Sequence, residues 1–120
     1  LAACPMSTAQ LHKTGAGVQA TWEKEGQVYW TRLDTPDLLF SPTGEGGHRK
    51  HPVLSANTRG ETLLAWTEGT GWNQGGALAW QLFNAQGAPT LVKGYLQDTI
   101  PVWGSVAVAA LPNGSFVIIY

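Results

Sequence analysis

The sequence predicts an all-β protein built from repeated antiparallel sheet units, and three observations support this prediction. Charged residues make up only 12% of the chain, whereas 15 of its 120 residues are glycine and 6 are tryptophan. This composition is typical of aromatic-rich strands joined by many tight turns. Apolar and polar residues alternate over short stretches, and no stretch keeps the 3.6-residue period of a helix. The third observation is an internal repeat.

The repeat is clearest between residues 60–66, GETLLAW, and residues 114–120, GSFVIIY, where a glycine stands six positions before an aromatic residue. Residues 17–22, GVQATW, follow the same pattern with one residue fewer. The closing aromatic residues are 44 positions apart (66 minus 22) and then 54 apart (120 minus 66). Units of roughly 40–50 residues with four strands each are typical of β-propeller blades. We therefore expect four-stranded antiparallel blades, with blade 1 at about 1–40, blade 2 at about 51–95 and half a blade at about 104–120.

The elements follow from alternation, from aromatic and β-branched residues in strands, and from Gly, Asn and Pro in turns. The first unit is predicted to hold strands at 4–12, 18–22, 27–33 and 38–40, with turns at 13–17 and 23–26 and a long loop at 41–50. The rest is predicted to hold strands at 52–56, 61–66, 77–83, 90–93, 106–110 and 115–120, short turns at 57–60, 84–87 and 111–114, and long loops at 67–76 and 96–103.

Two and a half blades cannot close a propeller, which needs about four to eight. The missing blades are expected to come from the rest of a parent chain or from other protein chains. The sequence has no initiator Met and stops at Tyr120 within an apolar run, which predicts that both ends are cut. The single cysteine, Cys4, cannot form a disulfide within the chain. We expect it to be a buried thiol or half of a disulfide with a missing part.

The charge and hydropathy of the chain exclude two classes of partner. A formal net charge of -1 provides no electrostatic basis for binding nucleic acid. No apolar run approaches the ~20 residues of a membrane-spanning helix. We therefore expect neither nucleic-acid binding nor a membrane span.

Candidate binding residues follow from the expected topology. The long loops 41–51, 67–76 and 96–104 would all leave one edge of the blades, and the short turns the other, and long loops on a rigid scaffold commonly carry binding sites. An exposed Trp beside amides, a carboxylate and cations suits stacking on a sugar or gripping a protein partner. The predicted ligand-binding residues are His48, Arg49, His51, Glu68, Trp72, Asn73, Gln74 and Trp103.

Several alternatives stay open for these residues. Trp72 and Trp103 would equally fill space between adjacent blades. Arg49 suits an anion or carboxylate, or is one of several solvated loop charges. His48 and His51 are not expected to bind a metal, because two cations separate them and no helix aligns them. Glu68 and Asp98 are a further candidate acid/base pair.

Four segments, CPMS at 4–7, GHRKHP at 47–52, RGETLLAWTEG at 59–69 and PNGSF at 112–116, resemble the sialidase-like family of β-propellers, also called the Asp-box (BNR) repeat family. That family is typically six-bladed and secreted or periplasmic, and it includes glycoside hydrolases beside members of unknown activity. The resemblance therefore implies a six-bladed parent in an exported, secreted or periplasmic protein.

The chain departs from the family in its catalytic features. An Asp box reads Ser/Thr-x-Asp-x-Gly-x-Thr-Trp between the third and fourth strands of a blade, where this chain has the turn Asn84–Gly87 without an Asp. Sialidases use three arginines, a Tyr/Glu pair and an acid Asp, whereas this chain has only Arg32, Arg49 and Arg59, and Arg59 lies in a turn at the opposite edge. No catalytic residue and no cofactor are expected.

Three functions are consistent with the sequence. The first is a non-catalytic propeller segment of an exported protein that binds a glycan or a protein through its long loops. The second is a fragment of a sialidase-like glycoside hydrolase whose catalytic residues lie outside this chain. The third is a structural subunit whose sheet is completed by partner chains.

Overall fold

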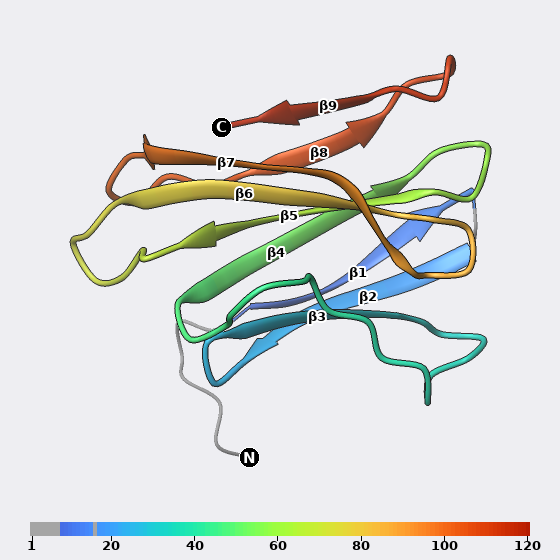
Figure 1. Ribbon diagram of the computed structural model, residues 1–120, viewed down its shortest axis with the longest axis horizontal. Helices are drawn as coiled ribbons and strands as arrows, with labels where there is room; N and C mark the ends of the chain where they lie inside the picture. The colour runs from blue at the N-terminus through green and yellow to red at the C-terminus, as the bar shows by residue number, and fades with distance from the viewer. Residues whose placement is uncertain (1–7, 16) are drawn as a thin grey trace.

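The computed structural model describes residues 8–15 and 17–120, and within them every regular element is a β-strand, which confirms the all-β prediction (Figure 1). The strands form three antiparallel sheets. Sheet 1 holds β1 (Ala9–Thr14), β2 (Gly17–Lys24) and β3 (Gln27–Arg32); sheet 2 holds β4 (Arg49–Ala56), β5 (Thr62–Glu68), β6 (Gly76–Phe83) and β7 (Pro89–Ile100); sheet 3 holds β8 (Ala107–Ala110) and β9 (Phe116–Ile119). No helix that could span a membrane occurs in this part of the chain. Cys4 and the CPMS segment lie outside the described residues.

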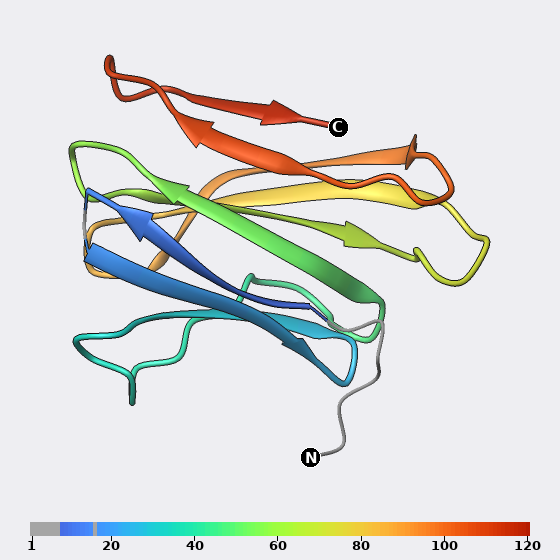
Figure 2. The same cartoon turned by 180° about the vertical axis from the view of Figure 1, so that it is seen from behind.

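The three sheets pack in series, with sheet 2 between the other two (Figures 1 and 2). One apolar cluster joins sheets 1 and 2 and includes Trp30, Leu64 and Phe83. A second cluster joins sheets 2 and 3 and includes Ala65 and Val106. The neighbours Leu64 and Ala65 enter different clusters because successive side chains of a strand point to opposite faces. Residues 62–67 of β5 are accordingly buried without interruption.

Three predicted boundaries are wrong, each for a local reason. The loop expected to run to residue 50 ends at His48, because Arg49 and Lys50 already pair with Glu68 and Thr67 in the β4–β5 ladder. β7 continues to Ile100, so most of the loop predicted at 96–103 is strand. The edge strand expected at 38–40 is reduced to one bridge between Trp30 and Phe40, since the Leu38 N–H bonds back to the Thr35 carbonyl in a turn.

Two of the predicted short turns, 57–60 and 84–87, share one construction. In the turns that begin at Asn57 and Asn84, the Asn side-chain oxygen accepts the backbone N–H groups two and four residues on, at 2.9–3.0 Å. A glycine with positive φ closes each of them, Gly60 at 79° and Gly87 at 86°, a backbone region in which other residues are strained. Asn57 does more than close its own turn, because its buried amide also donates to the Gly114 carbonyl at 2.9 Å and so ties sheet 2 to sheet 3.

Replacing Asn57 by Ala should lower the free energy of unfolding by about 2–3 kcal/mol, because both the turn bonds and the bridge to Gly114 are lost. Asn84→Ala is the matched control, since it removes the same two turn bonds from the following turn, and should cost about 1 kcal/mol. Urea unfolding of the two variants measures the difference. Equal losses would show that the bonds donated by the Asn57 amide, to the Gly114 carbonyl and to Glu61 Oε1, contribute nothing.

The stability of sheet 1 should depend on pH through His12. Burial lowers the pKa of His12 from its ordinary value of 6.5, and its Nε2 lies 2.9 Å from the Thr21 hydroxyl. Below pH 6.5 the unfolded chain takes up a proton before the folded protein does, so stability is full above this pH and declines below it.

Urea unfolding at about pH 7.5 and about pH 5.5 should therefore show a larger acid loss for the unaltered protein than for His12→Gln, whose amide keeps a donor and does not titrate. The same loss in both proteins would contradict the assignment to His12.

Candidate functional site

Four of the predicted residues meet at one hollow. His51, Trp72, Gln74 and Trp103 line a pocket of about 250 Å³. The pocket lies at the edge from which the connections between β5 and β6 and between β7 and β8 leave. The remaining lining residues are Lys50, Thr70, Gly71, Pro101 and Gly104. Residues from three separate stretches of the chain, within 50–51, 70–74 and 101–104, therefore line one pocket.

The two tryptophans form an aromatic corner. Their ring centroids are 4.9 Å apart and their planes are nearly perpendicular, at 86°. Trp72 is 78% exposed and Trp103 is 61% exposed. Two adjoining indole faces are thus open to solvent at right angles.

Short backbone structures present these rings. Gly71 and Gln74 exchange backbone hydrogen bonds of 3.1 and 3.2 Å, which places Trp72 and Asn73 at the tip of a small hairpin. A Cβ at Gly75 would collide with the Ile100 carbonyl, so only glycine lets this hairpin lie against the end of β7. Trp103 has a φ of 64°, a conformation in which a bulky residue is strained. Strain of this kind is found preferentially at functional sites.

The position of His51 in the pocket lining depends on the buried carboxylate of Glu23, which was not predicted from the sequence. His51 sits at the irregularity in the β4–β5 pairing with a φ of 56°. Its backbone N–H donates to Glu23 Oε2 at 2.6 Å, and its ring Nδ1 lies 3.8 Å from the same oxygen. The Glu23 side chain is only 7% exposed. Glu23 therefore holds the backbone of His51 in position, with the imidazole ring beside it.

A signal for Glu23 was present in the sequence but was assigned to a turn. In β2 the residues Gln19, Thr21 and Glu23 alternate, and the structure buries Gln19 and Thr21 against sheet 2. A polar residue at every second position of a strand indicates one polar face. Extended by one step, that alternation includes Glu23.

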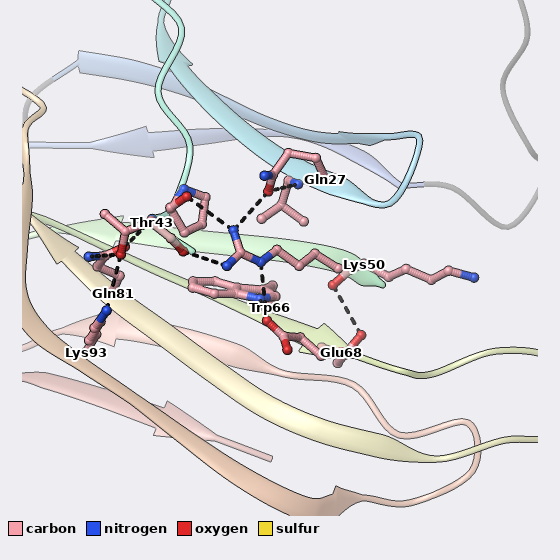
Figure 3. Close-up of polar contacts among 11 residues, drawn as sticks. Gln27, Thr43, Lys50, Trp66, Glu68, Gln81 and Lys93 are labelled. Atoms are coloured by element: carbon pink, nitrogen blue, oxygen red, sulfur yellow. Dashed lines mark hydrogen bonds and ion pairs between the residues drawn. The ribbon is translucent and has the colours of Figure 1, made fainter. Parts of the chain in front are cut away.

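A second hollow, of about 520 Å³, adjoins the first. It shares Lys50, Thr70 and Gln74 with the first pocket and adds His48. The Lys50 side chain extends away from Gln27, Trp66 and Glu68 (Figure 3). The predicted residue His48 thus belongs to the neighbouring hollow, and Asn73 stands exposed beside Trp72 at the hairpin tip.

Arg49 and Glu68, also predicted to bind a ligand, pair with each other instead, and the Glu68 side chain is only 25% exposed. The Arg49 side chain is 6% exposed. Its guanidinium donates to Glu68 Oε1 at 3.3 Å, to Gln27 Oε1 at 3.2 Å, and to the Pro42 and Thr43 carbonyls at 3.2 and 2.6 Å. Glu68 Oε1 also accepts the Trp66 indole N–H at 2.9 Å. Arg49 joins the loop after β3 to sheet 2 and is not placed to meet a ligand.

Arg49→Met should destabilise the protein by about 3–5 kcal/mol, because it leaves Glu68 without its cationic partner and two carbonyls without their donor. Arg59→Met is the control: the Arg59–Glu61 pair has a similar length, 3.0 Å, but the Arg59 side chain is 63% exposed, and exposed pairs contribute less than about 1 kcal/mol. Chemical unfolding of both variants gives the comparison. Similar small losses would remove the structural role assigned to Arg49.

The described residues contain no group of three or more His, Cys, Asp or Glu side chains arranged to hold a metal ion. Comparison with protein-family models, with curated proteins and with solved structures yields no match to this chain.

Proposed function

We propose that the aromatic corner of Trp72 and Trp103 binds carbohydrate. The observation that carries the proposal is the pair of exposed indoles at right angles in a mainly apolar pocket whose lining also includes four polar side chains. A pyranose ring has an apolar face of C–H groups and a rim of hydroxyls. One indole stacks on that face and the other closes against the edge of the ring, while Lys50, His51, Thr70 and Gln74 meet the hydroxyls.

The size of the hollow favours one sugar unit over a protein surface. A pocket of about 250 Å³ is smaller than the ~300–1,000 Å³ of typical ligand sites. A stable protein interface covers about 800 Å² on each partner, far more than two indole faces offer. The adjoining hollow of about 520 Å³ shares three residues with the first and gives room for a second sugar unit.

The packing of the sheets supports the further proposal that they are blades of a β-propeller. The first strands of the sheets, β1, β4 and β8, contact one another in series, as the inner strands of successive blades do. The turns at 57–60, 84–87 and 111–114 lie at one edge and the long connections at the other, so the proposed sugar site occupies the loop edge of the blades. Sheets of three, four and two strands correspond to two blades and half of a third.

The test is a glycan array followed by calorimetric titration of the tightest-binding glycan. Trp72→Ala and Trp103→Ala should each weaken binding at least about tenfold, which corresponds to ~1.4 kcal/mol. Tyr95→Ala is the control, because Tyr95 is 55% exposed on β7 and does not line the hollow. The absence of any bound glycan, or unchanged affinity in the double Trp variant, would refute the proposal.

A further inference from the structure

Three basic side chains gather at the two hollows beside the aromatic corner. His51 lines the first hollow, His48 lines the second, and Lys50 lines both. Among the described residues, neither lining contains Asp or Glu. The junction of the two hollows therefore combines hydrogen-bond donors with positive charge.

The backbone at the start of β4 brings these three side chains together. Successive side chains of a strand alternate between its faces, so His48 and Lys50 share one face while Arg49 between them points into the interior. Regular alternation would send His51 to the same side as Arg49. The irregularity in the β4–β5 pairing and the φ of 56° at His51 turn its ring back, so that it lines the same hollow as Lys50.

The carboxylates that flank this region already have partners. Glu68 pairs with Arg49 at 3.3 Å. Glu23 accepts the His51 backbone N–H at 2.6 Å, and its side chain is only 7% exposed. By contrast, none of the ion pairs found in residues 8–15 and 17–120 includes Lys50, whose side chain extends away from Glu68 (Figure 3). The Lys50 ammonium is thus left to interact with a ligand.

The neutral polar groups at the junction differ in what they can offer an anion. The Thr67 hydroxyl donates to the Lys50 carbonyl at 3.1 Å and lies 2.8 Å from the Thr70 hydroxyl. A hydroxyl has one proton to donate, so Thr70 donates to Thr67 and can only accept from a ligand. Gln74 Nε2 donates one of its two protons to a backbone carbonyl at 2.8 Å. An anion at the junction therefore meets the Lys50 ammonium, the imidazole N–H groups and the second amide proton of Gln74.

We propose that the sugar bound at the aromatic corner carries a sulfate ester, which lies against Lys50 at the junction of the two hollows. This inference rests on the proposed carbohydrate binding. A sulfate ester has three terminal oxygens that point in different directions, and the donors at the junction come from separate side chains.

The same donors suit other anions less well. The flat carboxylate is matched by the fork of an arginine, and Arg49, the arginine of this region, is buried and already bonded. A sulfate monoester carries one negative charge, which the Lys50 ammonium balances. A phosphate monoester carries about 1.5 to 2 negative charges near neutral pH and would call for a further cation.

The test compares sugars that differ only in their charged group. An array carries β-glycosides of galactose, glucose and mannose, each as the neutral sugar, as its separate monosulfates and as its uronic acid. Calorimetry then measures the affinities within the series that binds most tightly. One monosulfate should bind at least about tenfold more tightly than its neutral parent and at least about threefold more tightly than the uronic acid. Raising NaCl from about 20 to about 300 mM should reduce this preference, because salt screens the charged contact.

Two lysine variants locate the anion. Lys50→Gln removes the charge and should reduce the preference for the sulfated over the neutral sugar to less than about threefold. Lys93→Gln is the matched control, because it makes the same change at an exposed lysine of β7 that lines neither hollow, and it should keep the preference. The salt dependence of the unaltered protein decides the matter if Lys50→Gln fails to fold.

The neutral sugars separate this inference from the proposed function. Equal binding of neutral and sulfated forms would overturn the sulfate ester and leave carbohydrate binding in place. Tighter binding of the uronic acid, or equal losses in the two lysine variants, would overturn it in the same way. Sulfated sugar that binds equally well after Trp72 and Trp103 are both replaced by Ala would refute the aromatic corner as the sugar site, and this inference with it. The absence of binding by any form would refute both.

Discussion

The structure depends on the burial of β5 on both of its faces. Leu64 and Trp66 fill the space toward sheet 1, while Leu63 and Ala65 face sheet 3. Strands buried on both faces read as continuous apolar runs, and the polar and apolar sides that usually set register are then absent. In β5 the size of the side chains sets the register instead. The large Trp66 and the small Ala65 point to opposite faces, and neither fits in the place of the other. The polar residues at its two ends, Asn57 with Glu61 and Arg49 with Glu68, complete the specification of the register.

Polar contacts between sheets 1 and 2 then fix the position of the site. Gln19 donates to the Thr62 hydroxyl at 3.0 Å, and Thr21 donates to the Pro52 carbonyl at 3.2 Å, both in the interior. Glu23 is the next residue on the same face of β2, and it receives the His51 N–H. Buried polar groups are stabilising only when they are paired. This row of paired side chains on β2 therefore tolerates little sliding between sheets 1 and 2. It holds His51 at the wall of the pocket even when no ligand is bound.

The sequence predicted well what depends on local pattern and poorly what depends on which sheet lies opposite. The strand pairs and the Asn–Gly turns follow from alternation and from positive-φ residues such as Gly60, which need no knowledge of the rest of the fold. Trp72, Trp103, Gln74 and His51 were identified because long loops at one edge converge. Arg49 was expected at a loop surface, since a charged residue beside glycines and histidines usually is solvated. Its burial depends on Glu68, Gln27 and two carbonyls, which come together only when sheet 1 packs on sheet 2. Glu23 was missed for the same reason.

The two edges of the sheets differ in whether residues other than glycine take positive-φ positions, and this difference bears on where the protein can bind ligands. At the turn edge, glycines such as Gly60 and Gly114 take the positive-φ positions, and Asn57 and Arg32 link successive turns through the Gly114 and Ala85 carbonyls. At the loop edge, glycines such as Gly47 and Gly69 take this backbone region too, but so do His51, Asn73 and Trp103, which are not glycine. Each strained residue costs of order 1–3 kcal/mol and persists only where the surrounding structure holds it. A Trp in that conformation, with its ring exposed, contributes little to the core. We propose that this strain is retained for the contact of the ring with a bound sugar.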